Sequence, residues 1–185
     1  MKSQRSRLDR FIVCREGIKR SHVHQLLAQG RILLDGLAAE AMSQVVGPFT
    51  HVVLDRKVLQ AEQPRYIMLH KPPGMVSATC DEQHPTVLDL VSAPYAKALH
   101  IVGRLDFNST GLLLLTNDGR WSRGVSSPQR GVVKTYRVQL EQPFRSDYIE
   151  AFAAGLYFAF ENITTRPAKI RRLSDFEVEV DLVEG

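Results

Sequence analysis

Residues 100–119 read HIVGRLDFNSTGLLLLTNDG, and this stretch says most about the fold. The uniformly apolar run at residues 112–115 predicts a central strand that is covered on both faces of its sheet. Immediately before it, a polar loop bounded by Gly103 and Gly111 places Arg104 two residues ahead of Asp106. The pattern therefore anchors one carboxylate, beside one guanidinium, next to a rigid core.

Asp106 has several chemical interpretations. An aspartate in a turn rich in glycine and serine commonly caps its own backbone. An ionised carboxylate can also act as a nucleophile or a base, and a guanidinium a few ångströms away lowers an aspartate pKa by about 1 to 3 units. A glycosidase would need a second carboxylate, but Asp118 lies in the sequence TNDG, which favours a turn. The segment is also no P-loop, since neither Lys-Ser nor Lys-Thr follows Gly111.

The overall composition is that of a globular protein. Of the 185 residues, 44% are hydrophobic and 24% are charged, enough for one good core and a small second module. No apolar run is long enough for a signal peptide or a membrane span, so we expect a cytoplasmic protein without membrane association. Because Cys14 and Cys80 are far apart and the histidines are scattered, we expect free thiols and no metal site.

Positive charge is concentrated at the N-terminal end. Residues 1–31 contain eight Lys and Arg against two acidic residues, a net charge of +6. The other 154 residues contain 16 basic and 18 acidic residues, a net charge of −2. This asymmetry favours a polyanion-binding end, although a solvated charged surface is the alternative.

Apolar residues at helical spacing predict two short amphipathic helices in the first 30 residues. The first lies around residues 8–12, and the second lies between Ser21 as its N-cap and Gly30 as its stop. Residues 31–36 predict a strand that enters an Asp-Gly turn, and residues 51–54 predict another strand.

The polar run at residues 60–64 has the composition of a linker, so we expect one domain at residues 1–59 and a second at 65–185. In the second domain a helix is expected at residues 147–154. Strands are expected at residues 66–69, 112–115, 135–140 and 176–182. The prediction is an α+β fold in which a small helix-helix-strand domain precedes a mixed, mainly antiparallel sheet.

The N-terminal segment resembles the ribosomal-protein S-four type RNA-binding domain, a small helix-helix-strand module. The resemblance rests on RLDRFI at residues 7–12, SHVHQLL at 21–27 and GRILLDG at 30–36. It makes the basic residues of this end candidate phosphate contacts. These are Lys2, Arg5, Arg7, Arg10, Lys19, Arg20 and Arg31.

The remaining motifs resemble the RsuA family of ribosomal RNA pseudouridine synthases. They are HKPPG at residues 70–74, HPTV at 84–87, GRLD at 103–106, TGLLLLTNDG at 110–119 and KTYRV at 134–138. They stand in the family's order and approximate spacing, and the family carries the same type of N-terminal domain. The resemblance therefore spans nearly the whole chain.

The resemblance implies that a uridine within RNA is isomerised to pseudouridine without cofactor or metal. Asp106 matches the catalytic aspartate, and attack on the ring, attack on the sugar carbon and abstraction of a sugar proton all stay open as its first step. Tyr136 matches an active-site tyrosine expected to stack on the target base; cross-strand packing is its alternative. Arg104 matches an arginine that fills the space of an extruded base. Lys71 and Lys134 are candidates for contacts with the RNA backbone; a solvated surface lysine is the alternative for each.

In this family a Glu-Gly pair like that at residues 184–185 leads into a basic segment, so we expect a catalytic domain that is incomplete at the C-terminus, with uncertain activity. The alternative is a non-catalytic RNA-binding or ribosome-assembly protein with a degenerate synthase domain. The expected partner is ribosomal RNA or a pre-ribosomal particle, bound by a monomer. The sequence TRPA at residues 165–168 and the overall spacing favour small-subunit over large-subunit RNA, and no motif identifies the uridine.

Overall fold

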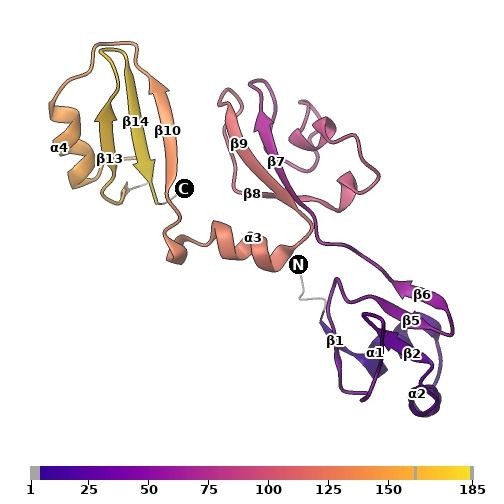
Figure 1. The fold of residues 1–185 in the computed structure, drawn as a ribbon. Coiled ribbons are helices and arrows are strands. Elements are labelled where there is room, and N and C mark those ends of the chain that lie inside the picture. The colour runs from indigo at the N-terminus through magenta and orange to yellow at the C-terminus, as the bar shows by residue number, and fades with distance from the viewer. Residues whose placement is uncertain (1–4, 161, 184–185) are drawn as a thin grey trace. The chain divides into compact units, whose positions relative to one another are not determined.

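The structure of this chain, a computed structural model, describes residues 5–160 and 162–183 (Figure 1). Its backbone divides into two compact units. One unit contains the residues up to Met68 together with Ser92–His100 and Leu115–Asp118. The other contains Leu69–Val91, Ile101–Leu114 and the residues from Gly119 onward.

The N-terminal part combines two helices with short antiparallel strands (Figure 1). The helices are α1 (Leu8–Glu16) and α2 (Arg20–Ala28), as the apolar spacing predicts. The main sheet has the order β3 (Leu37–Ala38), β2 (Ile32–Leu34), β5 (Val52–Leu54) and β6 (Lys57–Gln60). A separate antiparallel pair joins β1 (Ser6–Arg7) and β4 (Val45–Val46).

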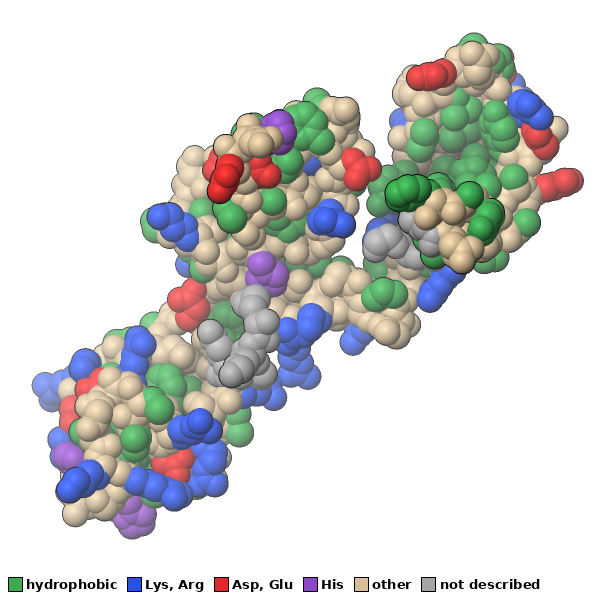
Figure 2. Space-filling model, turned by 180° about the vertical axis from the view of Figure 1, so that it is seen from behind, with side chains coloured by type: hydrophobic (Ala, Val, Ile, Leu, Met, Phe, Trp, Pro, Cys, Tyr) green, Lys and Arg blue, Asp and Glu red, His purple; other side chains and the backbone are tan. Residues whose placement is uncertain are grey.

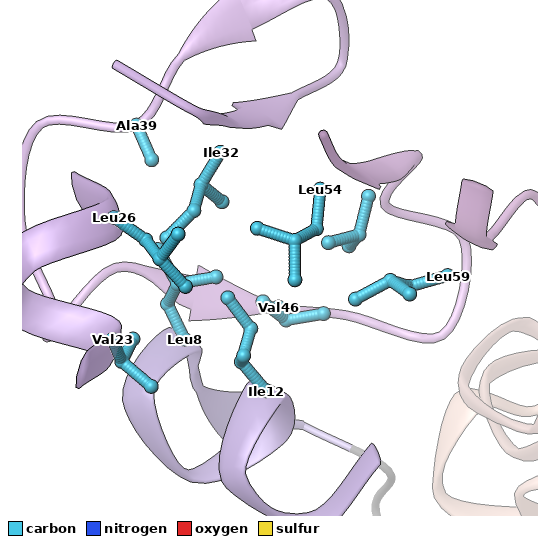
Figure 3. Packing of buried hydrophobic residues seen from close by; sticks show 10 residues of the cluster. Leu8, Ile12, Val23, Leu26, Ile32, Ala39, Val46, Leu54 and Leu59 are labelled. Atoms are coloured by element: carbon cyan, nitrogen blue, oxygen red, sulfur yellow. The ribbon is translucent and has the colours of Figure 1, made fainter. Parts of the chain in front are cut away.

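A single apolar core holds these elements together (Figure 3). Leu8 and Ile12, one turn apart on α1, are fully buried, and Val23 of α2 is buried beside them. Ile32 and Val52 from the paired strands β2 and β5 close the core from the sheet side. The helical spacing of apolar residues therefore produces the burial on which this part depends.

Left-handed residues make the tight turns of the sheet. Asp35 and Gly36, with φ of 51° and 86°, connect β2 to β3 as the Asp-Gly pair predicts. Asp55 and Arg56 connect β5 to β6 in the same way, although Arg rarely adopts positive φ, so the sequence did not indicate β6. The prediction of Ser21 as an N-cap was wrong, because α2 already begins at Arg20.

The four-leucine segment forms the middle strand of a three-stranded sheet. This strand, β9 (Gly111–Thr116), lies between β7 (Tyr66–Lys71) and β8 (His100–Val102). Its central position was predicted, and Leu113 and Leu115 are buried. The expectation of cover on both faces was wrong at one end, because the Leu112 side chain is 63% exposed.

A second three-stranded sheet lies nearer the C-terminus, with β14 (Glu177–Leu182) between β10 (Lys134–Gln139) and β13 (Lys169–Arg172). Both pairings are antiparallel. The alternating sequence of β14 buries Val178 and Val180, which pack with Ile170 and with partly buried side chains of α4 (Asp147–Ala154). The predicted half-exposed strand and helix are thus both present.

Shorter elements connect the sheets. They are η1 (Val87–Leu90), η2 (Ala96–Ala98), α3 (Gly119–Ser126), η3 (Pro128–Arg130), β11 (Tyr157–Phe158) and β12 (Ile163–Thr164). The mixture of helices with largely antiparallel strands confirms the α+β class. Within the described ranges, no helix has the length and apolar character that crossing a bilayer requires.

Truncating a buried leucine tests the N-terminal core. Leu8→Ala should lower the free energy of unfolding by about 2–5 kcal/mol, because it removes a fully buried side chain from close packing. Leu37→Ala is the matched control, since Leu37 is 76% exposed, and should cost less than about 0.5 kcal/mol. Urea unfolding followed by circular dichroism measures both, and equal losses would contradict the assignment of this core.

Candidate active site

The loop between β8 and β9 presents Asp106 to solvent. A backbone hydrogen bond of 3.1 Å from the Ser109 N–H to the Asp106 carbonyl closes a turn at this point. The Asp106 side chain is exposed, and its carboxylate accepts no hydrogen bond from any residue that the structure describes. The capping interpretation was therefore wrong, and the carboxylate is open to a ligand.

A buried lysine, Lys71, holds the backbone of this loop through hydrogen bonds. Lys71, at the end of β7, is fully buried, and its Nζ donates to four backbone carbonyls. Three of them belong to the loop: Asp106 at 2.9 Å, Phe107 at 3.1 Å and Ser109 at 2.8 Å. The fourth is Pro72 at 3.1 Å.

This arrangement corrects the prediction that Lys71 contacts RNA. Its ammonium is out of reach of solvent and already has more acceptors than protons. Gly74 adds a further bond, since its N–H donates to the Phe107 carbonyl at 2.9 Å. The motif at residues 70–74 thus binds the backbone of the Asp106 loop rather than a phosphate.

Arg104 lies in the same loop, and its side chain is exposed. The sequence places its guanidinium two residues from the Asp106 carboxylate, and the family resemblance implies that it fills the space of an extruded base. Among the described residues, no ion pair joins these two side chains. Arg104 is therefore available to an incoming ligand and is not engaged in holding Asp106.

Tyr136 and Lys134 lie on β10, where Tyr136 is paired with Val180 and Lys134 with Leu182. Both side chains are partly buried. No hydrogen bond or ring contact links Tyr136 to Asp106 in the described parts of the chain. The cross-strand environment of Tyr136 is thus present, while its placement beside Asp106 stays a prediction.

The bend at Thr116–Asp118, which the sequence predicts as a turn, is bonded to Arg65 and Tyr66. The Thr116 hydroxyl donates to the Arg65 backbone carbonyl at 2.6 Å, and the side-chain Oδ1 of Asn117 accepts the Arg65 N–H at 2.8 Å. The Tyr66 hydroxyl donates to Asp118 at 2.9 Å, which raises the pKa of that hydroxyl. This turn therefore fastens the chain where β7 begins.

The surface of the N-terminal part carries many Lys and Arg side chains, with acidic side chains among them (Figure 2). An open hollow of about 450 Å³ is lined by Arg7, Asp9, Arg10, Val13 and Arg20. Asp9 is buried and pairs with Arg7 at 3.2 Å and Arg20 at 2.8 Å. The hydrogen bond from Arg7 lowers the pKa of Asp9, so the carboxylate stays charged and orients both guanidinium groups.

The other predicted phosphate contacts differ in their surroundings. Arg5, Arg10 and Lys19 are exposed and pair with no acidic residue in the described structure. Arg31 instead binds both carboxylate oxygens of Asp55, at 2.5 and 2.6 Å, and lowers the pKa of that carboxyl. Lys2 lies outside the described residues.

Comparison with known proteins identifies the fold and its class of chemistry. Residues 65–173 match the family described as RNA pseudouridylate synthase. The chain belongs to this family. A crystal structure of a pseudouridylate synthase superimposes with a TM-score of 0.64 at 34% identity, covering 97% of this chain and 77% of that one.

Two relatives within the family carry the same name, ribosomal small subunit pseudouridine synthase A. The protein from Pseudomonas aeruginosa is 46% identical, and that from Escherichia coli strain K12 is 38% identical. Each match covers 97% of this chain and 78% of the relative. The resemblance to the RsuA family is thus confirmed over nearly the full sequence.

Replacing the buried ammonium tests its role in the loop. Lys71→Met keeps the length of the side chain but removes every donor, leaving carbonyls of the loop without a partner, so the free energy of unfolding should fall by about 2–5 kcal/mol. Lys97→Met, at an exposed lysine of η2, is the control and should stay within about 0.5 kcal/mol of the unmodified chain. Equal stability of the two variants in urea titrations would refute the structural role.

Proposed function

We propose that this chain isomerises a uridine of small-subunit ribosomal RNA to pseudouridine. The observation that carries the proposal is an exposed carboxylate, without a partner among the described residues, on a loop whose backbone is fixed by Lys71 in a chain of the pseudouridylate synthase family. The names of the two relatives support the choice of small-subunit RNA.

The reaction is an isomerisation, so substrate and product contain the same atoms. The bond from the sugar carbon C1′ to uracil N1 breaks, the ring turns, and a bond from C1′ to C5 forms. The proton on C5 leaves, and N1 gains one. Asp106 begins this sequence as a base or a nucleophile, and uracil itself accepts the negative charge as it leaves the sugar.

Arg104 is proposed to act while the target base leaves its stack, before any bond is broken. A base in a folded RNA must leave its stack to reach Asp106, which costs a few kcal/mol. The exposed guanidinium of Arg104, two residues from Asp106, is a planar cation that can stack in the space left behind. Tyr136 is proposed to stack on the extruded uracil, and Lys134 to contact the RNA backbone.

The N-terminal part is proposed to bind RNA as a domain of the ribosomal-protein S-four type, at residues 1–59, joined by residues 60–64 to a catalytic domain at 65–185. Its support is the helix-helix-strand order and the basic hollow around Asp9. Arg5, Arg10 and Lys19 are the stronger candidates for phosphate contacts, because Arg31 already binds Asp55.

Loss of the carboxylate charge should abolish the reaction. Unmodified small-subunit RNA incubated with the chain should gain one carbodiimide-dependent stop in primer extension, and Asp106→Asn should remove the stop without changing RNA affinity. Asp175→Asn removes a surface carboxyl that pairs only with Arg172 among the described residues and should retain activity. An active Asp106→Asn variant would contradict the catalytic role of Asp106. RNA binding by the unmodified chain without any modification of the RNA would favour the non-catalytic alternative.

Neutralising the exposed cations tests the RNA-binding end. The triple variant Arg5→Gln, Arg10→Gln, Lys19→Gln should reduce the slope of log K against log salt by about 2, since each lost phosphate contact contributes about 0.7 to 0.9. The control replaces three basic residues that already have acidic partners, Arg145, Arg171 and Arg172. Filter binding at several salt concentrations measures the slope, and an unchanged slope in the first variant would contradict the assignment.

A further inference from the structure

A serine hydroxyl holds the residue immediately before Asp106. Ser77 Oγ donates to the Leu105 carbonyl at 2.7 Å and accepts the Leu105 N–H at 3.1 Å. One side chain thus engages both backbone polar groups of Leu105, as a neighbouring strand would. Ser77 and Leu105 are both partly shielded from solvent, which strengthens these bonds relative to bonds in water.

The segment that carries Ser77 is itself held in place. Val76 forms a parallel bridge with Thr86, and its N–H donates to the Pro85 carbonyl at 3.0 Å. The Val76 carbonyl accepts the N–H of Val87, which is fully buried. The Ser77 hydroxyl therefore projects from a fixed support rather than from a free loop.

The contacts of Ser77 complete those of Lys71. Lys71 binds the carbonyls of residues 106, 107 and 109, all at or after Asp106, whereas Ser77 binds the residue before it. Asp106 is thereby restrained on both sides along the chain, while its carboxylate stays exposed. A reacting carboxylate needs such restraint, because a displacement of about 1 Å can cost about a hundredfold in rate.

We propose that Ser77 is a positioning residue for the reaction, acting through the backbone of Leu105 on the orientation of Asp106. This inference rests on the proposed function, in which Asp106 is the catalytic carboxylate. The serine hydroxyl both donates and accepts at this site, whereas alanine does neither and a thiol does both weakly.

The test separates positioning from folding and from RNA binding. Ser77→Ala should lower kcat about tenfold and leave KM and RNA affinity unchanged, because the carboxylate is misplaced while the binding surfaces are intact. Ser77→Thr keeps the hydroxyl and should restore kcat. Thr79→Ala, which removes an exposed hydroxyl two residues along, is the matched control and should behave as the unmodified chain.

Hydrogen–deuterium exchange gives a second readout that does not depend on activity. The Leu105 amide should exchange about tenfold faster in Ser77→Ala than in the unmodified chain or in Ser77→Thr. Unchanged exchange overturns the proposed clamp, and faster exchange with unchanged kcat overturns the positioning role. If the unmodified chain converts no uridine, the proposed function fails, while the exchange result still decides whether Ser77 holds Leu105.

Discussion

The shape of the candidate active site depends on one buried positive charge. An ammonium removed from water is costly unless hydrogen-bond acceptors replace its hydration. Around Lys71 those acceptors are backbone carbonyls, three of them from the loop that bears Asp106. A loop with few apolar side chains gains little from burial, so the charge supplies the constraint that a hydrophobic core supplies elsewhere in the chain.

In the N-terminal part, by contrast, two cations of the basic surface are paired with a buried carboxylate, that of Asp9. Asp9 is buried between Arg7 and Arg20, pairs with both, and is already one of the two acidic residues in the net charge of +6 for this end. The carboxylate fixes the direction of two flexible cations before any phosphate arrives. Less ordering entropy then has to be lost on binding.

The sequence predicted those helices and strands that local residue patterns determine. Apolar spacing located α1 and α2, alternation located β14, and the leucine run located the central strand β9. It failed where distant residues decide the outcome. Nothing near Arg31 indicates that Asp55, 24 residues away, binds it. Lys71 shows the same limit at the site, because its assignment to an RNA contact rested on the family resemblance, and lysine is seldom buried. What buries it is a set of carbonyls from residues 106 to 109, which come next to it only in the folded chain. The contact of Ser77 could not be predicted for the same reason, since its partner Leu105 lies 28 residues further along the chain.

In the Asp106 loop, the backbone atoms are held by other residues, while the Asp106 side chain is left exposed to a ligand. Lys71, Gly74 and Ser77 bind the Asp106 loop through its backbone atoms, and none of them binds the side chain of Asp106. The backbone is thus fixed by groups that do not compete with a ligand for the carboxylate. Had a cation instead paired with the carboxylate, the same restraint would have neutralised part of its charge and covered it. Holding the loop by its carbonyls and amides resolves the conflict between a rigid catalytic group and an accessible one.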